Sequence, residues 1–183
     1  MPTKSRIATH EKLTLVATLV VSLALADVAH AKMVAVGDTF PAWQLSDQTG
    51  KQVSSRELAG KTYLLWFYPK AMTPGCTAEG QALRDQFLAF QAKDVEILGV
   101  SFDEPAKNAE FCAAEAFPFR LLSDRDKTLA LAVGAADSKE QPVAKRISYL
   151  VGPDGKVLRA YDTVTPASHA DQVLQDIDST KTN

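Results

Sequence analysis

Residues 62–79 read TYLLWFYPKAMTPGCTAE, and their pattern is the most informative in the sequence about the fold. Its first seven residues form a continuous apolar and aromatic run, which is typical of a β-strand buried on both faces. After a loop that contains two prolines, residues 77–93 place Leu83, Phe87 and Phe90 at helical spacing. This spacing predicts a helix that buries one face. The stretch is therefore predicted to be a strand, a loop and a helix.

The remaining sequence continues this alternation of strands and helices. Asp103 is the expected N-cap of one helix, and Gly152-Pro153-Asp154-Gly155 is a hairpin turn signal. Strands joined through helices pair in parallel, and a hairpin adds an antiparallel pair. The sequence thus predicts an α/β, thioredoxin-like fold with a mixed central sheet flanked by helices. The other expected strands are 42–46, 95–100, 120–122, 147–151 and 157–161, and the other helices are a turn after a capping box at 54–57, 103–116, 127–133 and one from about 168.

The N-terminus has the layout of a secretory signal peptide. Basic residues precede an apolar run over residues 13–26, and Ala29-His30-Ala31 forms an A-x-A cleavage site. The alternative is an uncleaved membrane anchor, but the run is shorter than the ~20 residues that span a bilayer. We expect residues 1–31 to be the signal peptide and 32–183 to be a single domain. The expected location is outside the cytosol, in the bacterial periplasm, with no membrane attachment after cleavage.

Composition excludes several kinds of function. The chain has 183 residues and a net charge of −2, so it offers no basic field for nucleic acid. Beyond residue 31 the only histidine is His169, which leaves almost nothing for a histidine-based metal cluster or a Cys–His–Asp triad. We therefore expect neither a cofactor nor a metal site. Two cysteines, Cys76 and Cys112, remain in a chain whose expected compartment permits disulfides.

The helix after the loop is expected to begin around residues 73–77, so Cys76 lies in its first turn. Unpaired backbone N–H groups and the positive end of the helix dipole favour a thiolate over a thiol there. Thr73 lies one turn earlier, so its hydroxyl can face the sulfur and bind an incoming oxygen. The alternative is a buried, unreactive cysteine, which is what most free cysteines are.

The pattern Pro69-x-x-x-Thr73-x-x-Cys76 resembles the active-site motif of peroxiredoxins. The longer string YPKAMTPGCTAE is similar to the bacterioferritin-comigratory-protein, or PrxQ, subfamily. The likeness continues through FRLLSD (119–124), RISYLVGPDGKV (146–157) and DTVTPASHADQVL (162–174). It therefore covers essentially the whole chain after residue 31.

The resemblance implies a role for each matching residue. Cys76 would be the peroxidatic nucleophile, which attacks a hydroperoxide and becomes a sulfenic acid. Thr73 would hydrogen-bond the peroxide, and Pro69 would pack over the thiolate. Arg146 would stabilise the thiolate and the leaving oxygen, although an arginine at a strand start is usually a solvated surface charge. Glu79 would cap the first helical turn or position Arg146.

The second cysteine is the expected resolving residue. Many members of the subfamily carry a resolving cysteine five residues after the peroxidatic one, where this chain has Gln81. Other members carry it at the helix position of Cys112, so the resemblance assigns Cys112 this role. The alternatives are a small buried side chain and a permanent structural disulfide with Cys76. A disulfide needs Cα atoms about 4.4–6.8 Å apart. Because one cysteine is expected in the middle of a helix and the other at the start of another helix, they do not reach this distance without local unwinding, and we expect both helices to loosen on oxidation.

The expected activity is thus reduction of hydrogen peroxide and organic hydroperoxides, with an intramolecular disulfide as intermediate. The expected partners are the peroxide and a thioredoxin-like or other dithiol reductant, and the expected oligomeric state is a monomer. The alternative function is that of a thiol–disulfide oxidoreductase of the same fold. Such proteins use Cys-x-x-Cys at the helix start, and no second cysteine lies near enough to Cys76 to complete that motif.

Overall fold

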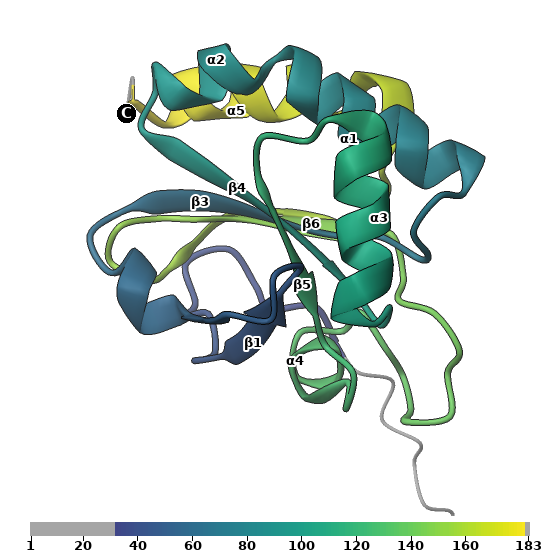
Figure 1. The fold of residues 1–183 in the computed structure, drawn as a ribbon. Coiled ribbons are helices and arrows are strands. Elements are labelled where there is room, and N and C mark those ends of the chain that lie inside the picture. Colours follow the sequence, from purple (N-terminus) through teal and green to yellow (C-terminus); the bar gives the residue numbers. More distant parts are fainter. Residues whose placement is uncertain (1–31, 182–183) are drawn as a thin grey trace, which may run out of the picture.

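The computed structural model describes residues 32–181 (Figure 1). The expected signal peptide, residues 1–31, lies outside the described residues. In chain order the elements are β1 (Gln44–Asp47), β2 (Gln52–Ser54), the 3-10 helix η1 (Ser55–Leu58), β3 (Thr62–Phe67), α1 (Pro74–Asp85), α2 (Phe87–Gln91), β4 (Val95–Ser101), α3 (Pro105–Glu115), β5 (Arg120–Ser123), α4 (Thr128–Ala132), β6 (Ile147–Val151), β7 (Val157–Tyr161), the 3-10 helix η2 (Pro166–Ser168) and α5 (His169–Lys181).

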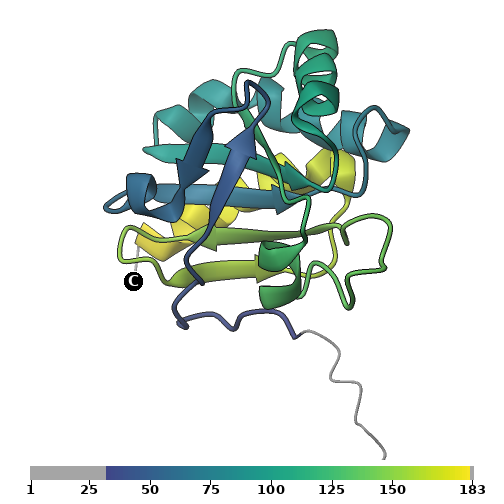
Figure 2. The same ribbon diagram turned by 60° about the horizontal axis from the view of Figure 1, so that its bottom comes forward.

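Seven strands form one mixed sheet in the order β2-β1-β5-β4-β3-β6-β7. The β3–β4 and β4–β5 pairs are parallel, and the other pairs are antiparallel. Figure 2 shows the dark blue β1–β2 hairpin at one end of the sheet and the yellow-green β6–β7 pair at the other. The predicted α/β fold with a mixed central sheet flanked by helices is confirmed.

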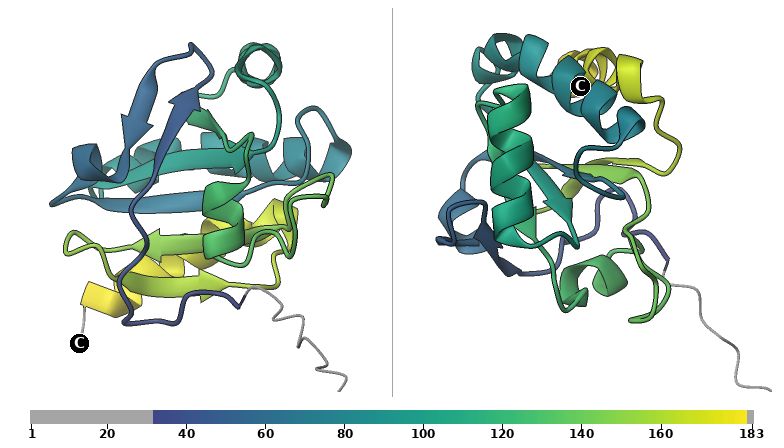
Figure 3. Two further views of the ribbon diagram at one scale, coloured as in Figure 1. Left: turned by 90° about the horizontal axis from the view of Figure 1, so that it is seen from below. Right: turned by 45° about the vertical axis from the view of Figure 1, so that its right-hand side comes forward.

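Strand β3 lies inside the sheet, between β4 and β6, and nearly all of its side chains are apolar. Alternate residues point to opposite faces, so Leu64 and Trp66 join one core cluster while Leu65 and Phe67 join the other. Helices α1, α2 and α5 cover the first face, and α4 lies on the second (Figures 1 and 3). The continuous apolar run therefore supplies both halves of the core at once, as a strand buried on both faces must.

The structure corrects three local details of the predicted elements. The predicted helix begins at Pro74, within the expected range of residues 73–77, but it does not run unbroken to residue 93, because it is interrupted at Gln86 and divided into α1 and α2. Helix α3 has Glu104 rather than Asp103 as its N-cap, because the carboxylate of Asp103 instead accepts a hydrogen bond from the backbone of Ala71. Ser54 precedes η1 without a side-chain capping hydrogen bond, and strand β2, which the sequence analysis did not predict, leads into it.

Within residues 32–181, none of the helices combines the length and the apolar character needed to cross a membrane.

Candidate active site

The strand, loop and helix of residues 62–79 place Cys76 in the first turn of α1. Thr73 is the N-cap in an extended conformation, and Pro74 follows at the first helical position, where a missing N–H does no harm. The carbonyl of Thr73 accepts the first helical hydrogen bond, from the N–H of Thr77, at 2.8 Å. Cys76 is thus the third helical residue, as the sequence predicts, and its side chain is fully buried.

Arg146, 70 residues after Cys76 in the chain, lies next to this sulfur in the structure. Strand β6 pairs antiparallel with β3, and Ile147 lies opposite Phe67, so Arg146 comes to the edge where β3 ends. Its Nη2 donates a hydrogen bond to Cys76 Sγ at 3.3 Å, and its Nη1 forms an ion pair with Glu79 Oε2. A Cβ on Gly75 would lie 3.1 Å from the same Nη2, so glycine keeps that space open for the guanidinium.

Glu79 fixes the arginine from inside the protein. Its side chain is fully buried, and its Oε1 has no hydrogen-bond partner among the described residues. Burial raises the pKa of Glu79 to about 7, although the guanidinium of Arg146 favours the charged form. Of the two roles that the sequence left open for Glu79, the contacts correspond to positioning Arg146.

Two hydrogen bonds hold the loop between β3 and α1. The hydroxyl of Thr73 donates to the carbonyl of Lys70 at 2.9 Å, and Pro69 is half-buried beside it. Asp103 Oδ2 accepts the N–H of Ala71 at 2.8 Å. No hydrogen bond links Thr73 Oγ1 to Cys76 Sγ in the described part of the chain. The structure therefore brings Cys76 and Arg146 into contact and places Pro69 and Thr73 on the loop that leads to them.

Asp103 and Asn108 are two site-supporting residues that the sequence analysis did not assign to the site. Asn108 is fully buried; its Oδ1 accepts the hydroxyl of Tyr68 at 2.7 Å, and its Nδ2 donates to Ser123 Oγ at 3.1 Å. Both residues follow the end of β4, the parallel neighbour of β3. Because parallel neighbours end at the same sheet edge, this adjacency is the signal that could have found them.

Ser148 and His169 form another buried polar pair. Ser148 is two residues after Arg146 on β6, and its Oγ is 2.9 Å from Nε2 of His169, the first residue of α5. Burial lowers the pKa of His169 to about 4, so this ring is neutral at physiological pH.

Cys112 is half-buried in α3, and both cysteines are free thiols. Its S–H donates to the carbonyl of Phe117 at 3.3 Å, and Gln48 Nε2 donates to the sulfur at 3.7 Å. Burial raises the pKa of the Cys112 thiol, which agrees with its position as a hydrogen-bond donor. The structure places both cysteine side chains on the same core cluster without joining them.

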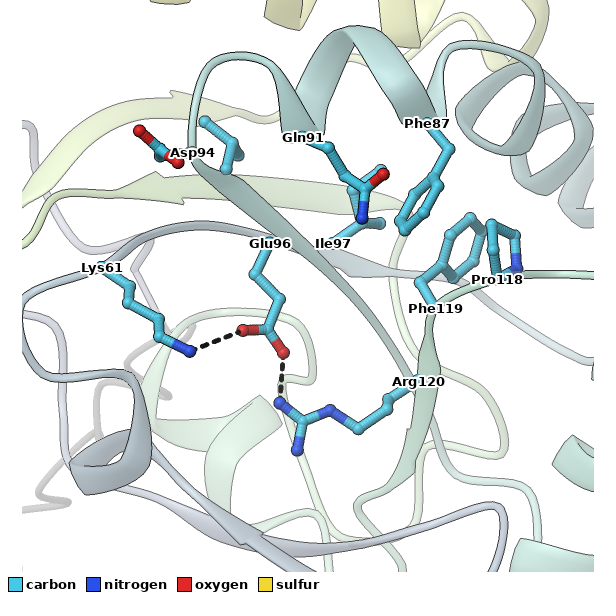
Figure 4. A pocket seen from close by; sticks show the side chains of 10 residues that line it. Lys61, Phe87, Gln91, Asp94, Glu96, Ile97, Pro118, Phe119 and Arg120 are labelled. Atoms are coloured by element: carbon cyan, nitrogen blue, oxygen red, sulfur yellow. Dashed lines mark hydrogen bonds and ion pairs between the residues drawn. The ribbon is translucent and has the colours of Figure 1, made fainter.

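A surface groove lies away from this site (Figure 4). It has a volume of about 510 Å³. It forms beside the first residues of β4, which have no partner on β5 because the pairing of these two strands begins with Leu98 opposite Arg120. Lys61 and Arg120 both form ion pairs with Glu96 at its lower edge, and Phe119 stands on the opposite side. Cys76 and Arg146 are not among the residues that line it.

The family model described as "AhpC/TSA family" matches residues 36–160. The chain belongs to this family. It is 38% identical over 143 residues to peroxiredoxin Bcp of Escherichia coli K12, a match that covers 75% of this chain and 92% of the relative. This peroxiredoxin is also 38% identical over 135 residues to peroxiredoxin Bcp of Xanthomonas campestris, with 71% and 84% of the two chains covered.

Solved structures agree with this assignment. The crystal structure of peroxidoxin BcpB from Mycobacterium tuberculosis superposes with a TM-score of 0.74 at 32% identity, over 79% of this chain and 96% of that one. A structure of Xylella fastidiosa PrxQ gives 0.75 at 26% identity, over 82% and 99%. The peroxiredoxin is thus of the Bcp/PrxQ subfamily, and it is an enzyme, a thiol peroxidase.

Proposed function

We propose that this peroxiredoxin reduces hydrogen peroxide and alkyl hydroperoxides with Cys76 as the peroxidatic nucleophile. The observation that carries the proposal is the 3.3 Å contact between Arg146 Nη2 and Cys76 Sγ at the start of α1, with Arg146 held by the buried Glu79. A guanidinium there stabilises negative charge first on the sulfur and then on the leaving oxygen.

The proposed first step is a displacement at oxygen. The thiolate of Cys76 attacks the terminal oxygen of the hydroperoxide, the O–O bond breaks, and the second oxygen leaves as an alkoxide or hydroxide that takes a proton. Cys76 becomes a sulfenic acid, and the peroxide becomes an alcohol or water. Thr73 is proposed to bind the peroxide, since its oxygen can still accept a hydrogen bond while it donates to Lys70. Pro69 is proposed to shield the thiolate from water.

Cys112 is proposed to resolve the sulfenic acid. Its thiol would give up its proton, and the resulting thiolate would attack the sulfur of Cys76, forming an intramolecular disulfide as the S–O bond breaks. The hydroxide that leaves takes up a proton and becomes water. Two structures of X. campestris peroxiredoxin Q each carry serine in place of one cysteine, and the two positions are as far apart in that chain as Cys76 and Cys112 are here, 112 − 76 = 36 residues. A thioredoxin-like or other dithiol reductant would then restore both thiols by exchange.

Alkyl hydroperoxides are included among the substrates because of a relative. A structural study of X. campestris bacterioferritin comigratory protein, 32% identical to this chain with a TM-score of 0.72, concerns alkyl peroxide reduction and covers 81% of this chain and 99% of that one. The proposal transfers this substrate class to the present chain.

The proposed cellular setting rests on the N-terminal sequence. Residues 1–31 have the basic start, apolar run and A-x-A site of a secretory signal peptide, and the match to the family model begins at residue 36. We propose that residues 32–183 form the mature domain and that it acts in the bacterial periplasm as a monomer.

The test is peroxide consumption by the mature domain with dithiothreitol or a thioredoxin as the electron donor. The wild type should turn over with both donors, Cys76→Ser should be inactive with both, and Cys112→Ser should lose turnover with thioredoxin. Turnover by Cys76→Ser would refute the proposed nucleophile, and unchanged thioredoxin-dependent turnover by Cys112→Ser would refute the proposed resolving role.

A further inference from the structure

Phe117, the second residue after α3, holds Cys112 by its backbone. Its N–H donates to the carbonyl of Cys112 at 3.0 Å, and its carbonyl accepts the S–H of Cys112 at 3.3 Å. Two polar groups of the proposed resolving residue therefore depend on where the backbone of Phe117 lies.

The ring of Phe117 is seated on the other cysteine helix. It lies against Gly80, four residues after Cys76 and thus one turn along the same side of α1. A Cβ on Gly80 would be only 2.3 Å from Phe117 Cζ and 2.9 Å from Cε1. Gly80 is not at a turn or a positive φ, so the ring is what requires glycine inside this helix.

Neighbouring aromatic rings complete the seat. The ring of Phe117 stacks on Phe119, with centroids 5.1 Å apart and planes at 16°, and meets Phe111 edge-on at 4.9 Å. It is only 6% exposed. A buried aromatic ring thus connects the segment that follows α3 with the middle of α1.

The backbone immediately before the ring is strained. Ala116 ends α3 in the left-handed conformation, with φ 53° and ψ 44°, which a residue with a Cβ adopts at an energetic cost. Two backbone hydrogen bonds offset this cost, since the N–H of Ala116 donates to the carbonyl of Ala113 at 3.4 Å and the N–H of Phe117 donates to the carbonyl of Cys112 at 3.0 Å. Packing of the Phe117 ring on Gly80 adds to these bonds. When the ring lifts, the two hydrogen bonds alone hold the strained turn that follows Cys112, and the turn opens more easily.

We propose that Phe117 is a positioning residue that couples the two cysteine helices and thereby sets the fate of the sulfenic acid. This inference rests on the proposed resolving role of Cys112. With the ring on Gly80, both cysteines are held apart and Cys76 faces peroxide beside Arg146. When the ring lifts, α1 and the end of α3 loosen together and the two sulfurs can meet.

Two reactions compete for the sulfenic acid. Attack by Cys112 gives the disulfide and water, whereas a second hydroperoxide oxidises the sulfenic acid to a sulfinic acid and is itself reduced to an alcohol or water. A tighter seat for Phe117 slows the first reaction and leaves the second unaffected. Phe117 therefore sets how much peroxide the enzyme tolerates before it is inactivated.

The experiment compares Phe117→Leu with Phe87→Leu. Phe87 packs on Phe119 at the edge of the groove in Figure 4 and has no described ring contact with Gly80 or α3, so it is a matched control. Reduced protein is mixed with increasing peroxide, quenched with a thiol-alkylating reagent, and analysed by mass spectrometry for disulfide and sulfinic acid. In Phe117→Leu, the peroxide concentration that gives equal amounts of the two products should rise about tenfold, the ratio that corresponds to ~1.4 kcal/mol. In Phe87→Leu it should stay at the wild-type value.

A second pair of variants tests the same contact from the other helix. Gly80→Ala places a methyl group where the ring lies, and Gly99→Ala is the control, since its Cβ would meet Leu121 Cδ2 at 2.6 Å in the sheet. Gly80→Ala should shift the product ratio toward disulfide and Gly99→Ala should not, which keeps the proposal testable if Phe117→Leu does not fold. If both Phe117→Leu and Gly80→Ala gave the wild-type ratio of disulfide to sulfinic acid, the coupling role would be overturned. Absence of any disulfide in the wild type would instead overturn the resolving role of Cys112, and the coupling role with it.

Discussion

Replacing Arg146 with methionine separates what this residue does for catalysis from what it does for stability. The substitution keeps a long flexible side chain and removes the group that lies 3.3 Å from Cys76 Sγ. At an effective dielectric constant of about 20, opposite unit charges at this separation attract by roughly 5 kcal/mol, which is an upper bound because solvent screens the pair. Removing one such charge-stabilising donor from an active site slows reactions roughly 10²–10³-fold. We expect that loss in the rate of reaction with hydrogen peroxide.

The same substitution leaves the buried carboxyl group of Glu79 without its ion-pair partner. Glu79 is fully buried, and removing one partner of a buried ion pair destabilises a protein by about 3–5 kcal/mol. Its folded-state pKa is already raised, to about 7, above the ordinary value of 4.5. A raised carboxyl pKa lowers the stability of the folded state as pH rises from 4.5 to about 7, because over this range the unfolded chain loses its proton while the folded chain keeps it. The stability deficit of Arg146→Met should therefore be larger at about pH 8 than at about pH 5.

A double variant completes the test. Arg146→Met/Glu79→Gln removes both charges of this pair, so it should recover most of the lost free energy of unfolding and lose the pH dependence that Glu79 contributes, while its reaction rate stays as low as that of the single variant. Stopped-flow tryptophan fluorescence gives the rate, and urea unfolding at the two pH values gives the stability. A rate within about threefold of wild type in Arg146→Met, or recovery of the rate in the double variant, would refute the reasoning.

Three further substitutions test the surroundings of the site. His169 stays neutral in the fold because burial lowers its pKa to about 4, so the wild type should lose up to about 3 kcal/mol more than His169→Gln in urea unfolding as pH falls from about 6.5 to about 4; equal losses would contradict the buried neutral ring. Asn108→Leu leaves the buried hydroxyl of Tyr68 without its 2.7 Å partner and should cost about 1–3 kcal/mol in the same experiment; an unchanged free energy of unfolding would contradict a stabilising role for this buried contact. Asp103→Ala removes the 2.8 Å anchor on the N–H of Ala71 and should lower the rate with peroxide several-fold at nearly unchanged secondary structure; an unchanged rate would mean that this anchor does not position the loop.

The local pattern of the sequence was enough for the fold and for the position of the nucleophile. An unbroken apolar strand, a proline-containing loop and an amphipathic helix fix Cys76 in the first helical turn. The break at Gln86 was not foreseen because residues on both sides of it share one helical periodicity, so the pattern continues where the backbone does not.

The parts of the site that escaped prediction depend on which strands are neighbours. Asp103 looks like an N-cap because it precedes a helix, and only its position beside the end of β3 makes it an anchor for Ala71. Likewise, Glu79 had two possible roles until the β3–β6 pairing brought Arg146 against it. Such contacts require the order and register of strands far apart in the chain, which no local pattern contains.

The central claim is that Cys76 and Cys112 form one intramolecular disulfide during each turnover. The most direct measurement is the intact mass of the reduced mature domain before and after one equivalent of hydrogen peroxide, followed by peptide mapping without reductant. The expected result is a loss of about 2 Da and a single linked pair of peptides that contain these two cysteines. A gain of about 16 or about 32 Da on Cys76, with Cys112 still a free thiol, would contradict it.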